Sequence, residues 1–110
     1  MVKGAGVGVE RGGFDAKLPA GLAPISDRGE DFVDHHTFVC IESDKVGLNH
    51  ISFEVQNFDD VMLGHEHLKG ANRYTHVWGI GRHVLGSQIF DYWQDPWGRV
   101  HEHWADTDML

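Results

Sequence analysis

The amino-acid sequence predicts an α+β domain in which strand, helix, strand, strand and strand follow one another, with one further strand ahead of them. Three observations lead to this prediction: an alternating apolar segment at 48–55, an amphipathic stretch with helix-capping residues at 57–69, and a Pro/Gly turn at 95–98 between two strand-like segments. With 110 residues, of which 41% are hydrophobic, the chain has room for one folded domain with one modest core.

The N-terminal segment, residues 1–33, is expected to be loop-rich and to precede a folded module over 34–108. Gly and Pro interrupt the segment repeatedly, and its apolar residues follow no sustained period. Gly4, Gly6 and Gly8 loosely resemble a phosphate-binding loop, but no strand is predicted before them and no helix after them, as such a loop requires.

The first two strands of the module are expected on either side of a short turn. Residues 35–42, "HHTFVCIE", are rich in β-branched and aromatic side chains, which favour a strand, and "SDKVG" at 43–47 is typical of a turn. In the strand 48–55 the side chains alternate, so His50 and Ser52 are expected on the face opposite the apolar residues. That apolar face consists of Ile51, Phe53 and Val55.

The helix is expected over about 57–69, because both of its ends carry recognisable signals. Asn57 can cap the N-terminus, and Asp59 and Asp60 suit the positive end of the helix dipole. Gly70 is expected to end the helix in the left-handed conformation. The apolar stripe of the helix is predicted to pack against the apolar face of the preceding strand. The stripe consists of Phe58, Val61, Met62 and Leu68.

Three further strands are expected after the helix, near 75–78, at 87–93 and at 99–104. Between the last two, "DPWG" has Pro at the second and Gly at the fourth position of a type I turn, so these strands are predicted to form a hairpin. In the last strand Glu102 alternates with the histidines on either side of it, and it therefore lies on the face opposite to theirs.

A histidine in one strand and a glutamate in another point to a metal site. The helix covers one face of such a sheet, and His50 lies on the other. If Glu102 faces the same side, an imidazole and a carboxylate converge, and these are two of the three ligands in the 2-His-1-carboxylate arrangement that holds non-haem Fe(II). The same pair also suits Zn or Mn. The alternative for each residue taken alone is a solvated or hydrogen-bonded side chain.

Charge and hydropathy argue against several classes of partner. A net charge of −8 disfavours contact with nucleic-acid phosphates, and no apolar run reaches the roughly 20 residues that span a bilayer. The N-terminus lacks the apolar region of a secretory signal, and the single cysteine, Cys40, permits no internal disulfide. We therefore expect a cytoplasmic protein with no nucleic-acid or membrane partner.

Several motifs, in this order and spacing, resemble one family. They are "HHT" at 35–37, "GLNHISFEV" at 47–55, "WGIGRHVLGSQIFDYWQDPWG" at 78–98 and "EHW" at 102–104. Together they are similar to the C-terminal part of type I extradiol ring-cleavage dioxygenases, which belong to the vicinal oxygen chelate superfamily with glyoxalase I and the bleomycin resistance proteins. The resemblance implies a βαβββ vicinal oxygen chelate module.

The resemblance also implies a reaction, which is extradiol cleavage of a catechol-type aromatic ring with O₂ at a non-haem Fe(II) site. His50 and Glu102 correspond to iron ligands of the family. Tyr92 corresponds to the tyrosine that hydrogen-bonds the catecholic substrate, and His83 to the histidine of "GRH" that lines the substrate pocket. His36 corresponds to the acid–base histidine near the bound oxygen.

The sequence departs from the family pattern in two places. The first iron histidine of the family lies in a preceding module, which would fall upstream of residue 1 here. The chain is therefore expected to be a truncated or divergent member, whose third ligand comes from another chain or is absent. An Asp or Asn that many relatives carry shortly after "GRH" is missing at 84–87.

Two alternative functions stay open at this point. One is a glyoxalase-like, metal-dependent lyase or isomerase that uses Mn, Zn, Ni or Co, and the other is a vestigial binding module. A homodimer or a larger assembly is expected, because one module leaves a sheet edge and an apolar face open. In such a dimer His50 and Glu102 of two copies could meet at one metal.

Overall fold

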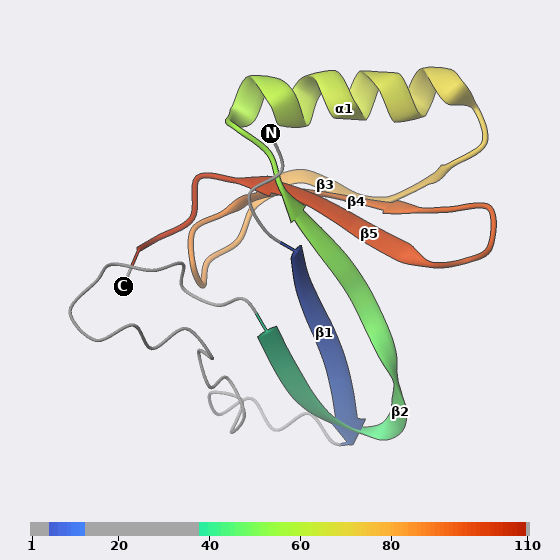
Figure 1. Cartoon of the computed structure of the whole chain (residues 1–110), viewed down its shortest axis with the longest axis vertical. Coiled ribbons are helices and arrows are strands. Elements are labelled where there is room, and N and C mark those ends of the chain that lie inside the picture. The colour runs from blue at the N-terminus through green and yellow to red at the C-terminus, as the bar shows by residue number, and fades with distance from the viewer. Residues whose placement is uncertain (1–4, 13–37, 110) are drawn as a thin grey trace.

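The structure is a computed structural model that describes residues 5–12 and 38–109, with side chains described from residue 44 onward. These residues form five strands and one helix, in the order expected for a βαβββ module with one more strand at its N-terminal side (Figure 1). The elements are β1 (Ala5–Gly12), β2 (Phe38–Glu54), α1 (Phe58–Ala71), β3 (Thr75–Arg82), β4 (Ile89–Gln94) and β5 (Val100–Ala105).

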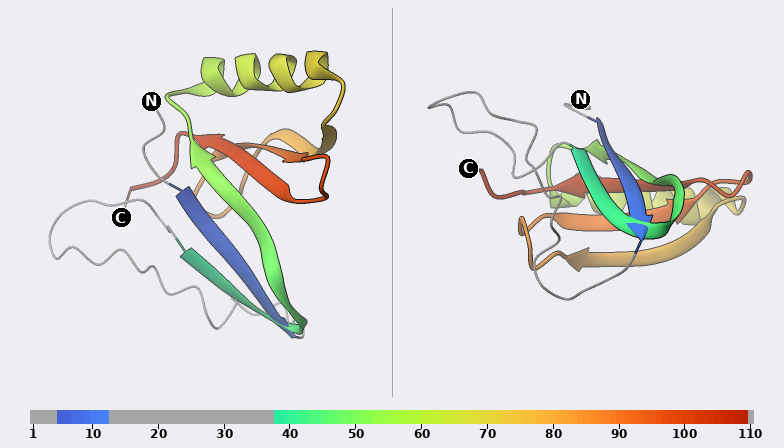
Figure 2. Two further views of the ribbon diagram at one scale, coloured as in Figure 1. Left: turned by 45° about the vertical axis from the view of Figure 1, so that its right-hand side comes forward. Right: turned by 90° about the horizontal axis from the view of Figure 1, so that it is seen from below.

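All five strands belong to one sheet, in the order β1-β2-β5-β4-β3. β2 and β5 run parallel, whereas β5 with β4 and β4 with β3 run antiparallel. The last strand of the sequence therefore lies in the middle of the sheet, between β2 and β4 (Figure 2). The predicted α+β fold is confirmed, and its strand order brings side chains of β2, β4 and β5 next to one another.

The N-terminal part of the chain contains more strand than the sequence indicates. The prediction that residues 1–33 are loop-rich misses β1, in which Val7 and Val9 alternate with glycines. Glycine weakens the local preference for a strand, and pairing with β2 supplies the stabilisation that the local sequence lacks. Residues 13–33 lie outside the described residues.

The predicted turn at 43–47 lies inside β2 rather than between two separate strands. The chain nevertheless doubles back there, because Val7 of β1 has two register partners in β2, Phe38 and Ile51. Figure 1 shows β2 reversing at its lower end, with β1 alongside both of its arms. Pairing with β1 keeps both arms extended up to the reversal, so the turn is shorter than predicted.

The helix begins as predicted and ends later. The side-chain oxygen of Asn57 accepts a hydrogen bond from the backbone N–H of Asp60 (3.1 Å), which confirms the N-cap. The prediction that Gly70 ends the helix is wrong: Gly70 lies inside α1, and Asn72 adopts the left-handed conformation, with φ of 52°. Asparagine tolerates the left-handed conformation better than most non-glycine residues. Gly70 and Asn72 are therefore both residue types that can end a helix, and the helix ends at the second of them.

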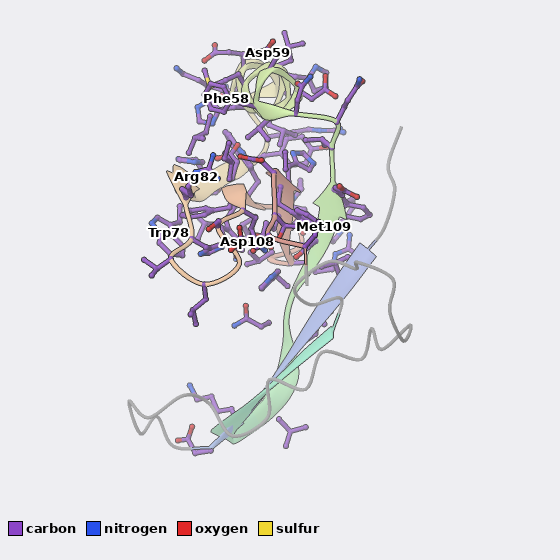
Figure 3. All side chains as sticks on the ribbon, turned by 90° about the vertical axis from the view of Figure 1, so that its left-hand side faces the viewer. Phe58, Asp59, Trp78, Arg82, Asp108 and Met109 are labelled. Atoms are coloured by element: carbon purple, nitrogen blue, oxygen red, sulfur yellow. The ribbon has the colours of Figure 1, made fainter. Side chains whose placement is uncertain are left out.

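The helix lies over β3, β4 and β5, and not over β2 as its apolar stripe predicted. The strand order explains the difference: β5 and β4 lie between β2 and β3, so the helix that connects β2 with β3 must cross above them. Of the predicted stripe, Val61 is buried, whereas Phe58 and Met62 remain exposed. Figure 3 looks along α1 and shows helix and sheet as two layers, with Trp78 at the edge strand β3.

The hairpin of β4 and β5 forms as predicted. The backbone N–H of Gly98 donates to the oxygen of Asp95 (3.0 Å), and the N–H of Asp95 donates to the oxygen of Arg99 (2.9 Å), which closes the turn. β3 extends further than the predicted 75–78, to Arg82.

β3 approaches β4 closely at a glycine. A Cβ atom at Gly81 would lie 2.8 Å from Cζ of Phe90, so only glycine fits there without a shift of the ring. The Phe90 ring is therefore held directly against the backbone of β3, on the face of the sheet that carries the candidate site described below.

Alternation along β4 divides the side chains between the two faces of the sheet. Asp91 and Trp93 contact groups on the α1 side. Phe90 and Tyr92 lie on the opposite side, which we call the open face because no helix of the described residues covers it. Among the residues whose side chains are described, the buried apolar ones are Val61, Phe90, Trp93, Trp104 and Ala105. No helix among the described residues is long and apolar enough to cross a membrane.

Candidate functional site

Glu102 lies at the centre of the open face. Its strand, β5, is flanked by β2, where Ser52 is its register partner, and by β4, where Tyr92 is. Side chains at paired positions of neighbouring strands point to the same face, so both neighbours bring polar groups to Glu102. Only 2% of the residue is exposed, and a carboxylate buried to this extent needs hydrogen-bond donors.

Ser52, His50 and His83 contact the two oxygens of this carboxylate, and Tyr92 also hydrogen-bonds it. Oε2 accepts a hydrogen bond from Oγ of Ser52 (2.5 Å) and lies 3.2 Å from Nε2 of His50. Oε1 lies 3.3 Å from Nε2 of His83. One strand, β2, and the loop after β3 therefore bring side chains to this carboxylate of β5.

The loop that carries His83 is tied to the rest of the protein. The backbone N–H of His83 donates to the oxygen of Gln88 (2.9 Å). The guanidinium of Arg82 donates to the oxygen of Ser87 (2.5 Å) and to the carboxylate of Asp106 (2.7 Å). These contacts hold the His83 imidazole in place beside Glu102, although it does not belong to a strand.

The contacts around Glu102 keep its carboxyl group ionised. Burial by itself raises the pKa of Glu102, but hydrogen bonds with His50, His83, Ser52 and Tyr92 outweigh burial and lower the pKa from 4.5 to about 2. The group is therefore a carboxylate at neutral pH, which is the form that binds metal cations.

His50 presents Nε2 to this carboxylate. Its Nδ1 lies 2.6 Å from Oδ1 of Asn49, an acceptor that orients the ring. Nε2 lies 3.2 Å from Oε2 of Glu102 and hydrogen-bonds it. Two electron-pair donors at this distance need a proton or a metal cation between them. The residues present therefore fit a divalent metal ion, with Asn49 orienting the imidazole.

Tyr92 lies beside this pair as a protonated phenol. Burial raises its pKa most, and the charge of Glu102 and a hydrogen bond with Glu102 raise it further. The hydroxyl lies 3.1 Å from Nε2 of His83, and the ring meets the His50 ring edge-on at 5.1 Å between centroids. Tyr92 can therefore donate a hydrogen bond to an oxygen of a ligand bound at Glu102 and His50.

Aromatic rings form a platform next to these polar groups. The ring of Trp78 lies 4.3 Å from that of Phe90 and is stacked on Tyr92 at 5.7 Å, with an interplanar angle of 16°. The ring of Phe90 is stacked on His83 at 4.0 Å. Trp78 is 58% exposed, so the platform reaches the surface. An aromatic surface beside an ionised carboxylate suits an aromatic ligand with polar substituents.

The structure brings together His50, His83, Tyr92 and Glu102, all of which the sequence analysis singled out. Their roles as metal ligands or catalytic groups stay predictions, which the geometry alone does not test. The other candidate, His36, lies outside the residues whose side chains are described.

Three contributors to the site were not singled out from the sequence: Ser52, Trp78 and Phe90. The strand pattern contained a signal for two of them, because Ser52 shares a face with His50 and Phe90 shares a face with Tyr92. No such signal exists for Trp78, because the register between β3 and β4 shifts around it and simple alternation fails there.

Comparisons with known proteins give relatives by sequence and by fold. No family model matches the chain. Metapyrocatechase 2 of Cupriavidus necator is 37% identical over an alignment of 95 residues, and the match covers 78% of this chain and 29% of that protein. The chain thus spans under a third of the length of the curated relative that it matches.

Solved structures share the fold, among them a glyoxalase and a dioxygenase. The Mn(II)-bound glyoxalase from Novosphingobium aromaticivorans superimposes with a TM-score of 0.65 at 30% identity, over 70% of this chain and 25% of that chain. The 2,3-dioxygenase LapB from Pseudomonas sp. KL28 superimposes with a TM-score of 0.65 at 22% identity, over 70% of this chain and 27% of that chain, which is a likeness of fold alone. The relative found by sequence and the structures found by fold agree with the family resemblance that the sequence motifs indicate.

Proposed function

Because this chain carries an extradiol dioxygenase-like module of the vicinal oxygen chelate superfamily, we propose that it provides the site at which O₂ opens a catechol-type ring. By the same resemblance the chain is an enzyme. The observation that carries the proposal is the facing pair of His50 Nε2 and Glu102 Oε2, 3.2 Å apart, beside an aromatic platform. A catechol combines the two properties that this site would recognise, a flat ring and adjacent oxygen atoms.

Fe(II) is the metal that we propose for this pair, since one imidazole and one carboxylate are two of the three ligands that non-haem iron takes. The third ligand would come from outside the described residues. Bound there, Fe(II) would supply the electron transfer from the ring to O₂. Mn, Zn and Ni remain alternatives, because imidazole and carboxylate ligands bind these metals as well.

The side chains around the metal position have distinct tasks in this proposal. Tyr92 donates its hydroxyl proton in a hydrogen bond to one oxygen of the catechol and orients the ring. His83 borders the ring position, where its stacking on Phe90 keeps the imidazole fixed. Trp78 and Phe90 hold the ring and exclude water from one side of it. His36 is proposed as the group that takes up and returns a proton, on the family resemblance alone.

Metal analysis and oxygen uptake test this function. Protein purified without oxygen is analysed for metals, reloaded with Fe(II) and given catechol, while oxygen consumption and the absorbance of the ring-opened product are recorded. We expect bound iron and oxygen uptake that requires catechol. Glu102→Gln should lose the oxygen uptake and the iron held beside His50, whereas His67→Asn, which changes an exposed histidine of α1, should keep both. Protein that holds iron and binds catechol yet consumes no oxygen would contradict the proposal.

A second candidate function rests on the fold match to the Mn(II)-bound glyoxalase, which is also the more similar of the two solved structures in sequence. In that case the same His50 and Glu102 pair would hold Mn, Zn or Ni for a lyase or isomerase reaction without O₂. Air-stable metal content and turnover of a glyoxalase-type substrate without oxygen consumption would favour this candidate. Catechol-dependent oxygen uptake would exclude it.

We also propose that two copies of the chain associate through the open face. No described helix covers this face, and the edge strand β3 exposes Val77 (52%) and Trp78 (58%) beside it. A second copy related by a twofold axis could supply the further metal ligand. Light scattering at micromolar concentration measures the assembly, and a monomer with metal bound at full affinity would contradict this arrangement.

A further inference from the structure

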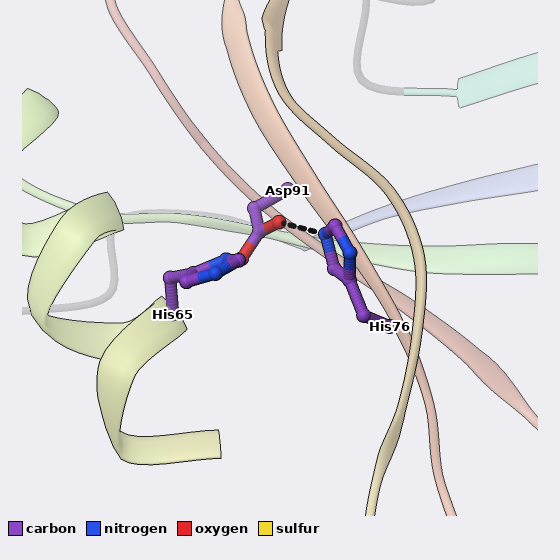
Figure 4. Close-up of side chains that lie close together, drawn as sticks. All are labelled: His65, His76 and Asp91. Carbon is purple, nitrogen blue, oxygen red and sulfur yellow. Dashed lines mark hydrogen bonds and ion pairs between the residues drawn. The ribbon is translucent and has the colours of Figure 1, made fainter. Parts of the chain in front are cut away.

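A second group of histidines surrounds a carboxylate on the opposite face of the sheet. Asp91 of β4 is completely buried under α1. Its Oδ2 lies 3.1 Å from Nδ1 of His65 in α1, and its Oδ1 lies 2.9 Å from Nε2 of His76 in β3 (Figure 4). The three residues come from three different elements, and none of them belongs to the open-face site.

The spacing of these groups suits a small divalent cation. The ligand atoms of His65, His76 and Asp91 all lie within 4.8 Å of one another. In a tetrahedral zinc site with metal–ligand bonds of about 2.0–2.2 Å, neighbouring ligand atoms are about 3.3–3.6 Å apart. The two nitrogen–oxygen distances of 3.1 and 2.9 Å, each to a different oxygen of Asp91, are somewhat shorter, so small side-chain movements would complete the geometry.

The surroundings of the cluster resemble those of a metal site. The indole N–H of Trp93 donates to Oδ2 of Asp91 and so fixes the orientation of the carboxylate. The two imidazoles lie against the Trp93 ring at 5.2 and 4.7 Å. The His76 side chain is 35% exposed and that of His65 is 18% exposed, so an ion with its water can reach them.

We propose that His65, His76 and Asp91 form a second metal site that binds a zinc-like divalent cation, with water as the fourth ligand, and that this ion fastens α1 to the sheet. The helix has little other anchorage: Val61 is buried, but Phe58 and Leu63 are 47% and 69% exposed. One ion bonded to all three elements would supply the connection that apolar packing does not. The site differs from the open-face site in position, in residues and in the task of the metal.

Cobalt titration in a suitable background tests this site separately from the open face. The full chain with Glu102→Gln, which disables the open-face site, is stripped with a chelator and titrated with Co(II). We expect one equivalent to bind with the visible absorption of tetrahedral Co(II), and Zn(II) to displace it and raise the melting temperature. Adding His76→Asn should lower the affinity by more than about 100-fold, since it removes a direct ligand. Adding His67→Asn, on the exposed side of α1, should leave the affinity unchanged.

Two binding results would overturn the proposal: absence of Co(II) binding in the Glu102→Gln protein, or equal affinity in the His76→Asn and His67→Asn proteins. A melting temperature that is the same with Zn(II) and with chelator would show that the three residues form a hydrogen-bonded cluster only, and it would overturn the proposal as well. Circular dichroism checks the fold, and His65→Asn replaces His76→Asn if the latter fails to fold. Oxygen uptake is not a readout here, so failure of the dioxygenase proposal leaves this test unaffected.

Discussion

Two buried carboxylates, Glu102 and Asp91, lie on opposite faces of the same sheet, each beside two imidazoles. Around Glu102 the remaining donors are hydroxyl groups, and the neighbouring rings reach the surface. Around Asp91 the remaining donor is an indole, and a helix lies above it. One hairpin therefore carries two polar clusters whose surroundings suit different tasks. The cluster on the open face suits exchange of a ligand, and the cluster on the other face suits attachment of the helix.

Strand alternation explains why the two carboxylates lie on opposite faces of the sheet. β4 and β5 each place successive side chains on opposite faces, so a carboxylate at Asp91 and a carboxylate at Glu102 cannot share a face in this register, where Tyr92 is the partner of Glu102. Each buried charge then requires its own donors, because an unpaired buried carboxylate is strongly destabilising. The chain meets this requirement with histidines drawn from α1, β2, β3 and the loop after β3.

The largest effect is expected from Glu102→Gln. The amide keeps the size of the side chain but removes the negative charge that, in the proposed function, would hold a cation beside His50 Nε2. Loss of this ligand should exceed the 10–100-fold loss of metal affinity that is typical of groups behind the ligands, and oxygen uptake should disappear. Metal titration and oxygen consumption measure both. Unchanged metal content would show that Asp91, and not Glu102, is the main metal-binding carboxylate.

The pH dependence of unfolding separates Glu102 from the other carboxylates. Its pKa is about 2 in the folded protein and 4.5 when unfolded, so the unfolded state binds the proton first as the pH falls. This difference stabilises the metal-free fold by about 3 kcal/mol at pH above 4.5, and the contribution is lost as the pH falls from 4.5 through about 2. Urea denaturation at pH 5.5 and pH 3 measures it. The stability of Glu102→Gln should depend less on pH in this range, and an equal dependence in both proteins would contradict the assignment.

Tyr92→Phe should affect turnover more than metal binding. The hydroxyl contacts Nε2 of His83 at 3.1 Å and can point to a ligand oxygen, but it is not placed as a metal ligand. Removing a group that orients and stabilises the reacting oxygen typically costs about 10²-fold or more in rate. Kinetics with catechol and metal analysis of the same preparation provide the test. Loss of metal in this variant would mean that Tyr92 acts on the metal and not on the substrate.

Local pattern was sufficient to predict most of this architecture. Alternation in the strands gave the faces of His50 and Glu102, "DPWG" gave the hairpin, and Asn57 gave the start of the helix. Each of these features depends on residues close together in the sequence, for which propensity and turn chemistry are informative. Convergence of His50 and Glu102 also needed the assumption that both face the same side, which the parallel pairing of β2 and β5 satisfies.

Features that depend on distant pairing could not be predicted in the same way. β1 is a strand because β2 pairs with it, and its Gly-rich sequence gives no such indication. The helix lies over β3, β4 and β5 because of the strand order, which no local pattern contains. The cluster around Asp91 joins a helix and two strands, so His65 and His76 had no recognisable relation in the sequence.

The smallest effect is expected from Ser52→Ala, and it bears most directly on the comparison between the two faces. Ser52 donates to Oε2 of Glu102 behind the proposed metal position, and Trp93 donates to Asp91 in the same way on the other face. Its removal leaves both imidazoles in place but takes away one donor that keeps the pKa of Glu102 low. Metal affinity of the open-face site should therefore fall by about 10-fold, at the low end for a group that supports a ligand. Isothermal titration with Mn(II) measures this, and Ser52→Thr, which keeps the hydroxyl, is the matched control. If Ser52→Ala and Ser52→Thr lose affinity equally, packing and not the hydrogen bond is the function of this serine, and the two carboxylates are then supported in different ways.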